Sequence, residues 1–119
     1  MSELSGEELA KIVQEVLQNP QKYQSEAKIL LKLSIWYRQG SAYIDEANYT
    51  IVFGEVDEVT LREWDAGYPY AKGRDVVLIP KSVPTVVIYE EVWDFGEDRG
   101  RSVTVYVFTG SNWVSVSIQ

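Results

Sequence analysis

Two adjacent carboxylates in the middle of an apolar segment are the residues whose type and spacing could do chemistry. The segment reads VIYEEVWDF over residues 87–95, with Glu90 and Glu91 at its centre. Successive side chains of a β-strand point to opposite faces, so one glutamate must face each side of a sheet. A carboxylate among aromatic rings can contact a ligand, or transfer a proton if its pKa is shifted toward neutrality.

The composition excludes several other kinds of chemistry. The chain has no cysteine and no histidine. Disulfides, thiol nucleophiles, thiolate metal sites and the Ser-His-Asp arrangement are therefore impossible. The glycine spacings of dinucleotide-binding and P-loop motifs do not occur, nor does a calcium-binding Asp-x-Asp-x-Asp-Gly loop. We expect no catalytic residue, no metal and no cofactor, although carboxylates and tyrosines could still serve an enzyme without histidine.

Length and charge limit the class of protein and its partners. The 119 residues carry 18 acidic and 11 basic side chains, a net charge of −7, which repels a phosphate backbone. No apolar run approaches the roughly 20 residues of a membrane span, and the N-terminus lacks the order of a signal peptide. We expect a single domain over residues 1–119 that is soluble and cytoplasmic and binds neither nucleic acid nor membrane.

The N-terminal third is expected to be helical. Ser5 and Glu8 have the spacing of a capping box, and apolar residues then recur on one face up to Leu17, which predicts a helix over about 5–18. Asn19-Pro20 ends it. A second helix is expected over about 20–38, with apolar residues around most of its circumference, so that it must be covered on more than one side.

From about residue 42 to residue 118 the apolar period changes to two, which predicts strands. The expected strands are 43–53, 56–64, 75–79, 85–95, 102–109 and 113–118. Two helices followed by strands indicate an α+β domain, in which the helices pack on a meandering, curved antiparallel sheet of about five to six strands.

The register of the last three strands can be predicted from turn length. A two-residue turn at Gly110-Ser111 would place Val105 opposite Val116 and Phe108 opposite Trp113. If residues 96–101 form the preceding loop, Val92 would lie opposite Val105, Glu90 opposite Val107, and Glu91 opposite Tyr106. Both registers sort the side chains into an aliphatic face, the expected seat of the second helix, and an aromatic face.

The aromatic face supplies most of the candidate binding residues. Glu90 would point toward the valines, so we expect it to lie at the rim of the core, to find a basic partner or to be displaced by a bulge. Glu91 would lie on the aromatic face, either as an ordinary solvated residue or as a ligand contact. The candidates on this face are Tyr89, Glu91, Trp93, Tyr106, Phe108 and Trp113.

A second candidate region is the aromatic segment from Glu63 to Tyr70. It brings Trp64, Tyr68 and Tyr70 into a turn-rich loop together with two carboxylates. Aromatic rings give a loop a large contact area, which favours binding. The same residues could equally fold back as a lid over the edge of the sheet.

These observations favour a non-catalytic interaction module. The expected helix over 20–38 and the aromatic face together expose more apolar surface than one short amphipathic helix can cover, so we expect a homo-oligomer or a complex with another protein. The alternative is a small-molecule-binding protein, or an enzyme without histidine, that uses a carboxylate and tyrosine pocket on a concave sheet. A less favoured alternative is an acidic inhibitor that mimics nucleic acid.

Overall fold

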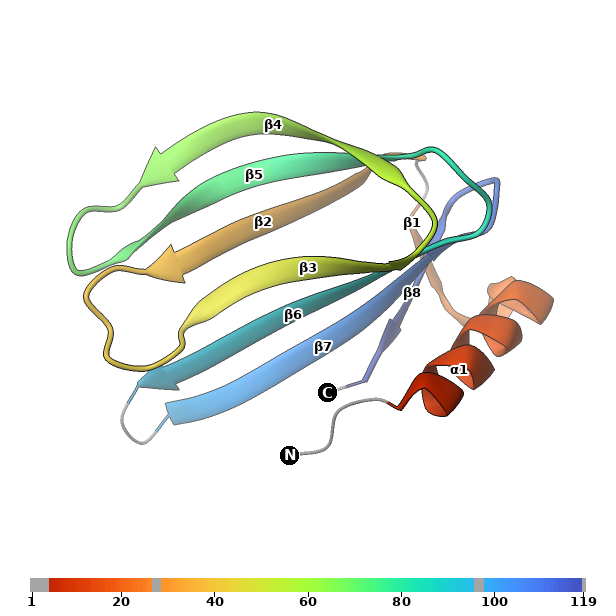
Figure 1. Ribbon diagram of the computed structural model, residues 1–119, viewed down its shortest axis with the longest axis horizontal. Helices are drawn as coiled ribbons and strands as arrows, with labels where there is room; N and C mark the ends of the chain where they lie inside the picture. The colour runs from red at the N-terminus through yellow and green to blue at the C-terminus, as the bar shows by residue number, and fades with distance from the viewer. Residues whose placement is uncertain (1–4, 27–28, 96–97, 119) are drawn as a thin grey trace.

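The chain folds into one antiparallel sheet with a helix against one of its faces (Figure 1). The computed structural model describes residues 5–26, 29–95 and 98–118. Its elements are α1 (Gly6–Gln18), the short 3-10 helix η1 (Pro20–Lys22), β1 (Gln24–Glu26), β2 (Leu31–Arg38), β3 (Glu46–Phe53), β4 (Val56–Asp65), β5 (Ala71–Pro80), β6 (Thr85–Phe95), β7 (Asp98–Phe108) and β8 (Trp113–Ser117). The strand order is β1-β8-β7-β6-β3-β2-β5-β4.

The expected second helix is wrong, because most of its residues form strands. In β2 the buried residues Leu31, Leu33 and Ile35 alternate with Lys32 and Ser34, which is the period of a strand. On a helical wheel the same run looks apolar all round, and a buried strand cannot be told from a buried helix by apolar content alone. The alternation of apolar and polar residues is the feature that assigns this segment to a strand.

The expected five to six meandering strands are also wrong. Over residues 5–26, 29–95 and 98–118 the sheet has eight strands: the three-residue β1 and seven of five residues or more. Only β6, β7 and β8 form a meander, since β2 lies between β3 and β5, and β6 pairs with β3. The fold is therefore mostly antiparallel sheet with one α-helix among the described residues.

The α1 helix begins and ends as its sequence predicts. The Ser5 side chain accepts a hydrogen bond of 3.1 Å from the backbone N–H of Glu8, so half of the capping box is formed. Asn19 closes the helix with its backbone N–H on the Glu15 carbonyl. Val16 is fully buried against valines of β6, β7 and β8. The aliphatic face of the sheet therefore seats α1 in place of the expected second helix.

One of the two predicted registers is confirmed and the other is wrong. In the β7–β8 pair, Val105 lies opposite Val116 and Phe108 opposite Trp113, as the two-residue turn requires. In the β6–β7 pair, Glu91 lies opposite Ser102 and not Tyr106, a shift of four residues. The strands pair as far as Phe95 and Asp98, so the connection is shorter than the predicted loop.

The even shift explains why the faces were nevertheless predicted correctly. Moving a strand by four residues returns every side chain to the same side of the sheet. Val105 and Val107 pack with α1 on what we call the outer face, while Tyr106 and Phe108 pack on the inner face. The inner-face core comprises Leu31, Leu33, Ile35, Val76, Leu78, Val87, Phe108 and Trp113.

The inner face is enclosed because the sheet bends round it. Tyr49 of β3 hydrogen-bonds Glu58 of β4, although β2 and β5 lie between those two strands in the sheet. Neighbouring strands lie about 4.8 Å apart, so in a flat sheet these two strands would be roughly 14 Å apart. The chain thus covers its own aromatic face, whereas the outer face depends on α1.

Candidate functional site

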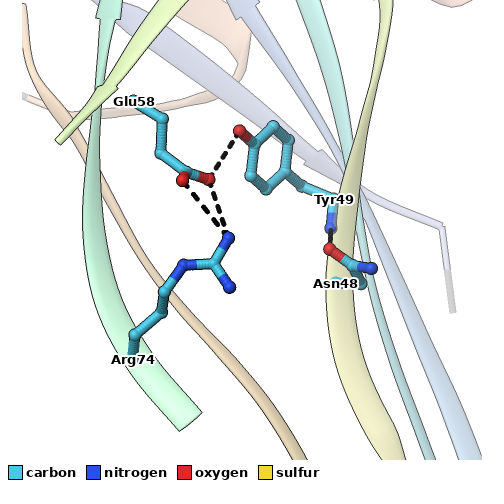
Figure 2. A network of polar contacts seen from close by, with 4 residues as sticks. All are labelled: Asn48, Tyr49, Glu58 and Arg74. Atoms are coloured by element: carbon cyan, nitrogen blue, oxygen red, sulfur yellow. Dashed lines mark hydrogen bonds and ion pairs between the residues drawn. The ribbon is translucent and has the colours of Figure 1, made fainter. Parts of the chain in front are cut away.

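A polar network joins three strands across the bend of the sheet (Figure 2). The Tyr49 hydroxyl donates to Glu58 Oε1 at 2.8 Å, and a terminal nitrogen of Arg74 donates to both carboxylate oxygens of Glu58 at 3.2 Å. Burial raises the pKa of Tyr49 to about 12, with the Glu58 hydrogen bond and charge acting in the same direction. Tyr49 is therefore a neutral hydrogen-bond donor at pH 7.

Beside this network the inner face opens into a charged pocket of about 420 Å³. Lys72 lies with its Nζ atom 5.8 Å from the centroid of the Tyr37 ring, on the adjoining strand. Asp65 Oδ1 accepts hydrogen bonds from Gln39 Nε2 and from the backbone N–H of Gly67, both at 2.8 Å. The pocket is lined by Tyr37, Glu63, Trp64, Asp65, Lys72, Gly73 and Arg74.

A second network surrounds the buried carboxylate of Asp75 on β5. It accepts hydrogen bonds from Arg62 Nε at 2.7 Å, Ser34 Oγ at 2.9 Å and Trp64 Nε1 at 3.3 Å. The Arg62 hydrogen bond, followed by that of Ser34, holds the pKa of Asp75 below its usual range. Asp75 therefore stays ionised and ties β2 and β4 to β5.

The protonation states around these networks do not equip them for acid–base catalysis at neutral pH. The hydrogen bond to Tyr37 raises the pKa of Lys72, so the amine is protonated. The Gly67 backbone hydrogen bond lowers the pKa of Asp65, and burial raises the pKa of Tyr89. A general acid or base needs a pKa near the working pH, and all of these shifts lead away from neutrality.

Several of the predicted aromatic residues pack inside the chain itself. Trp113 is 0% exposed, its ring lies 5.5 Å from that of Phe108, and its indole N–H donates to the Ile29 carbonyl. The Tyr89 hydroxyl donates to the Ser34 carbonyl at 2.8 Å, and Tyr106 packs partly buried on the same core. These four side chains hold the inner face together.

The two glutamates of the opening segment have different surroundings. Glu90 forms an ion pair with Arg101 on β7, so the expected basic partner is present. Glu91 lies half-buried between Ala47 and Ser102, on the same face as Tyr89. The expected neighbour of Glu91, Tyr106, instead lies opposite Val87.

Trp93 stands apart at the far end of β6. A Cβ atom on Gly100 would lie 2.0 Å from its indole ring, so the ring covers the glycine of the facing strand. Trp93 also lines a wide, open depression together with Tyr43 and Ile44. The structure therefore separates Trp93 from Trp113 and Phe108, which are in the core.

The aromatic segment 63–70 is divided between two environments. Trp64 belongs to β4 and donates to Asp75. Tyr68 is exposed, and a Cβ atom on Gly40 would lie 2.6 Å from its hydroxyl, so the loop folds back on the β2–β3 connection. Tyr70 is also exposed, and its carbonyl accepts a hydrogen bond from Gln39. This arrangement resembles the lid alternative, although both tyrosines stay accessible.

An apolar groove beside α1 was not predicted from the sequence. A groove of about 530 Å³ runs between α1 and the end of β3, and we call it the α1–β3 groove. It is lined by Gly6, Leu9, Ala10, Val13, Gln14, Leu17, Val52, Phe53, Pro84 and Val86. None of these side chains carries a charge. Phe53 is 61% exposed and Leu17 is 40% exposed.

The α1–β3 groove combines two segments far apart in the sequence, which explains why it was missed. The α1 helix contributes the exposed residues Ala10 and Leu17 to the groove, together with Val13, which also packs on the sheet. The signal in the sequence was the run Ile51-Val52-Phe53, which breaks the alternation of a half-buried strand. Whether this run lines a groove depends on where α1 packs, and the run alone does not show that.

The chain matches no protein-family model, no curated protein and no solved structure. Among the described residues, no helix is long and apolar enough to cross a membrane. Within the same ranges, no group of three or more acidic side chains is placed to hold a metal ion.

Proposed function

We propose that the protein is a non-catalytic interaction module that binds an apolar surface of a protein partner in the α1–β3 groove. The observation that carries the proposal is that the described residues lining the groove are uncharged and include a phenylalanine that is 61% exposed. Exposed aromatic and aliphatic side chains gathered in one concavity are typical of protein-binding sites. The predicted aromatic interface is replaced in this proposal, because Trp113 and Phe108 are buried.

The arrangement of α1 on the sheet explains why the α1–β3 groove is exposed. The inner face is covered by the bend of the sheet, but α1 is the only helix against the outer face among the described residues. One 13-residue helix covers the valines of β6, β7 and β8 and leaves Val52 and Phe53 uncovered. A sheet must bury its apolar face against another layer. A partner protein can cover the part of the outer face that α1 leaves exposed.

The proposal can be tested with a model partner. The probe is a synthetic amphipathic helix with one stripe of leucines and equal numbers of Glu and Lys, so that net charge does not drive binding. We expect calorimetry to detect binding and Phe53→Ser to weaken it about tenfold or more, or about 1.4 kcal/mol. The matched control is Tyr43→Ser, which removes an aromatic side chain that is 65% exposed elsewhere.

Two outcomes would contradict the proposal. One is the absence of binding. The other is an equal loss in Phe53→Ser and Tyr43→Ser, which would show that the peptide adheres to any exposed aromatic side chain. Circular dichroism of both variants checks that they remain folded, which we expect because neither side chain is buried.

The charged pocket beside Tyr37 supports a second candidate function, the binding of a small polar molecule. Its volume of about 420 Å³ lies within the usual range for ligand pockets, about 300–1,000 Å³, and Tyr37 and Trp64 line it with charges of both signs. Lys72→Met removes one of these charges. If this candidate is right, a screen of small metabolites by NMR will find a ligand that shifts the Trp64 indole signal in the wild type and not in Lys72→Met.

A further inference from the structure

We infer that β3 binds an extended segment of a partner protein as an additional strand, along the edge that faces away from β6 between Tyr49 and Phe53. We call this the open β3 edge. The proposed contact uses the backbone of β3 and does not depend on what fills the α1–β3 groove. Three observations support it: the pairing of β3, the exposure of its residues and the contrast with the other strand edges.

The two edges of β3 are paired over different lengths. β6 pairs with β3 from Glu46 to Phe53, whereas β2 pairs with it only at Glu46 and Ala47. Figure 1 shows β3 separating from β2 toward the C-terminal end of β3. Beyond Ala47, β3 therefore has no paired strand on this side in the part of the chain that the structure describes.

A hydrogen bond of Tyr49 shows which backbone groups point to the open β3 edge. Its N–H donates to the side-chain Oδ1 of Asn48 at 2.8 Å and not to another strand (Figure 2). Successive residues of an antiparallel strand direct their N–H and C=O groups alternately to its two edges, so Ile51 points the same way as Tyr49. Among the described residues, Ile51 has no strand to pair with on this side. An extended peptide supplies the missing donors and acceptors.

The residues along the open β3 edge are exposed and mostly apolar. Thr50 is exposed, Ile51 and Val52 are each 39% exposed, and Phe53 is 61% exposed. β-Branched and aromatic residues such as these favour strand pairing. The edge therefore offers a partner both backbone groups and apolar side chains.

The two outermost strands of the sheet, by contrast, are protected against pairing with another chain. Charged residues, bulges and short strands are the usual means of such protection. β1 has only three residues, and β4 has a bulge between Thr60 and Arg62. β4 also carries Asp57, Glu58, Arg62, Glu63 and Asp65. The open β3 edge has no charged residue, and its bulge follows Ile51.

The charges around the open β3 edge define the chemistry of the partner. Glu46 and Glu55 lie beyond the two ends of the uncharged run, and both are exposed. The whole chain has a net charge of −7. The complementary segment is therefore apolar in its centre and carries lysine or arginine at its ends.

The test uses a short peptide in which valine and threonine alternate between pairs of lysines. We expect calorimetry to detect binding. Hydrogen exchange followed by NMR should show the Ile51 amide protected about tenfold or more when the peptide is bound. The Thr50 amide, which points to β6, should change little.

A matched peptide and matched protein variants make the result specific. Methyl groups on the central backbone nitrogens of the peptide keep its side chains and charges but remove its N–H donors, and should weaken binding about tenfold or more. Ile51→Lys places a charge on the open β3 edge and should weaken binding by a similar factor. Val59→Lys makes the same change at a residue of β4 that is 46% exposed and should leave binding unchanged. Circular dichroism checks that both variants are folded.

Four results would overturn the inference. They are the absence of binding, equal binding of the methylated peptide, an Ile51 amide that the peptide does not protect, and a larger loss in Val59→Lys than in Ile51→Lys. Protection of Ile51 in the free protein that disappears on dilution would also overturn it, because the edge would then hold a second copy of the chain. If the helical peptide binds and the extended peptide does not, the groove proposal stands and only the strand addition is refuted.

Discussion

At the scale of single residues, the chain uses its charged groups to hold strands together. Asp75 is buried among three donors from two neighbouring strands, and Glu58 joins Tyr49 of β3 to Arg74 of β5. A buried carboxylate is tolerated when its hydrogen bonds are satisfied. Asp75 and Glu58 therefore have a structural role in joining neighbouring strands.

Replacing Asp75 by asparagine tests this structural role. The pKa of Asp75 is lowered by folding, so its ionised form stabilises the protein above its unfolded pKa of about 3.9, and this contribution is lost as the pH falls toward the folded pKa. We expect Asp75→Asn to lower the melting temperature at pH 7, and the difference from wild type to shrink as the pH is taken from 5 to below 3.

Thermal unfolding followed by circular dichroism at several pH values makes this measurement. Glu63→Gln is the matched control, because Glu63 is an exposed carboxylate on the same β4–β5 hairpin and should have little effect at any pH. A difference between Asp75→Asn and wild type that is as large at pH 3 as at pH 7 would show that Asp75 acts through packing and not through its charge.

At the scale of elements, the sheet depends on a close approach between β2 and β5. Gly73 lies opposite Trp36, and a Cβ atom at position 73 would lie 2.1 Å from the Ile35 carbonyl oxygen. Because the obstacle is backbone, the neighbouring strand would have to move. The register of β2 against β5, and with it the inner-face core, requires glycine here.

Gly73→Ala should therefore destabilise the fold by about 1–3 kcal/mol or more, as overpacking of a core does. Gly6→Ala is the control, because nothing lies within 4 Å of a Cβ at Gly6 and alanine favours a helix over glycine. Urea unfolding of both variants gives the comparison. Equal stability of Gly73→Ala and wild type would mean that β2 and β5 lie farther apart at this point than in the structure.

The elements also show what could be predicted from the sequence. Local signals were sufficient for α1, whose capping residue Ser5 acts as expected, and for the β7–β8 hairpin, whose turn length sets its register. The helix expected over 20–38 was wrong because apolar content outweighed the alternation of Leu31, Leu33 and Ile35. The α1–β3 groove could not be predicted, because it depends on a contact between residues about 40 positions apart.

At the scale of the whole molecule, the two faces of the sheet are covered by different means. The bend of the sheet covers the inner face, and the molecule measures 44 × 32 × 20 Å, so it is wide and thin. In the described part of the chain, one α-helix lies on the outer face, toward one end of the sheet (Figure 1). The exposed apolar surface beside that helix is the feature that the proposed function uses.

We propose that the α1–β3 groove is the binding surface of the molecule. Methyl NMR spectra recorded while the model peptide is added test it most directly, because they locate the contact in the wild-type protein. We predict that the largest shifts occur at Leu17, Val13 and Val52, and that Leu33 and Ile35 in the inner-face core do not move. If the largest shifts instead lie at the methyl groups of the inner-face core, or at Ile44 near the other end of the sheet, the groove is not the binding surface and the account is wrong.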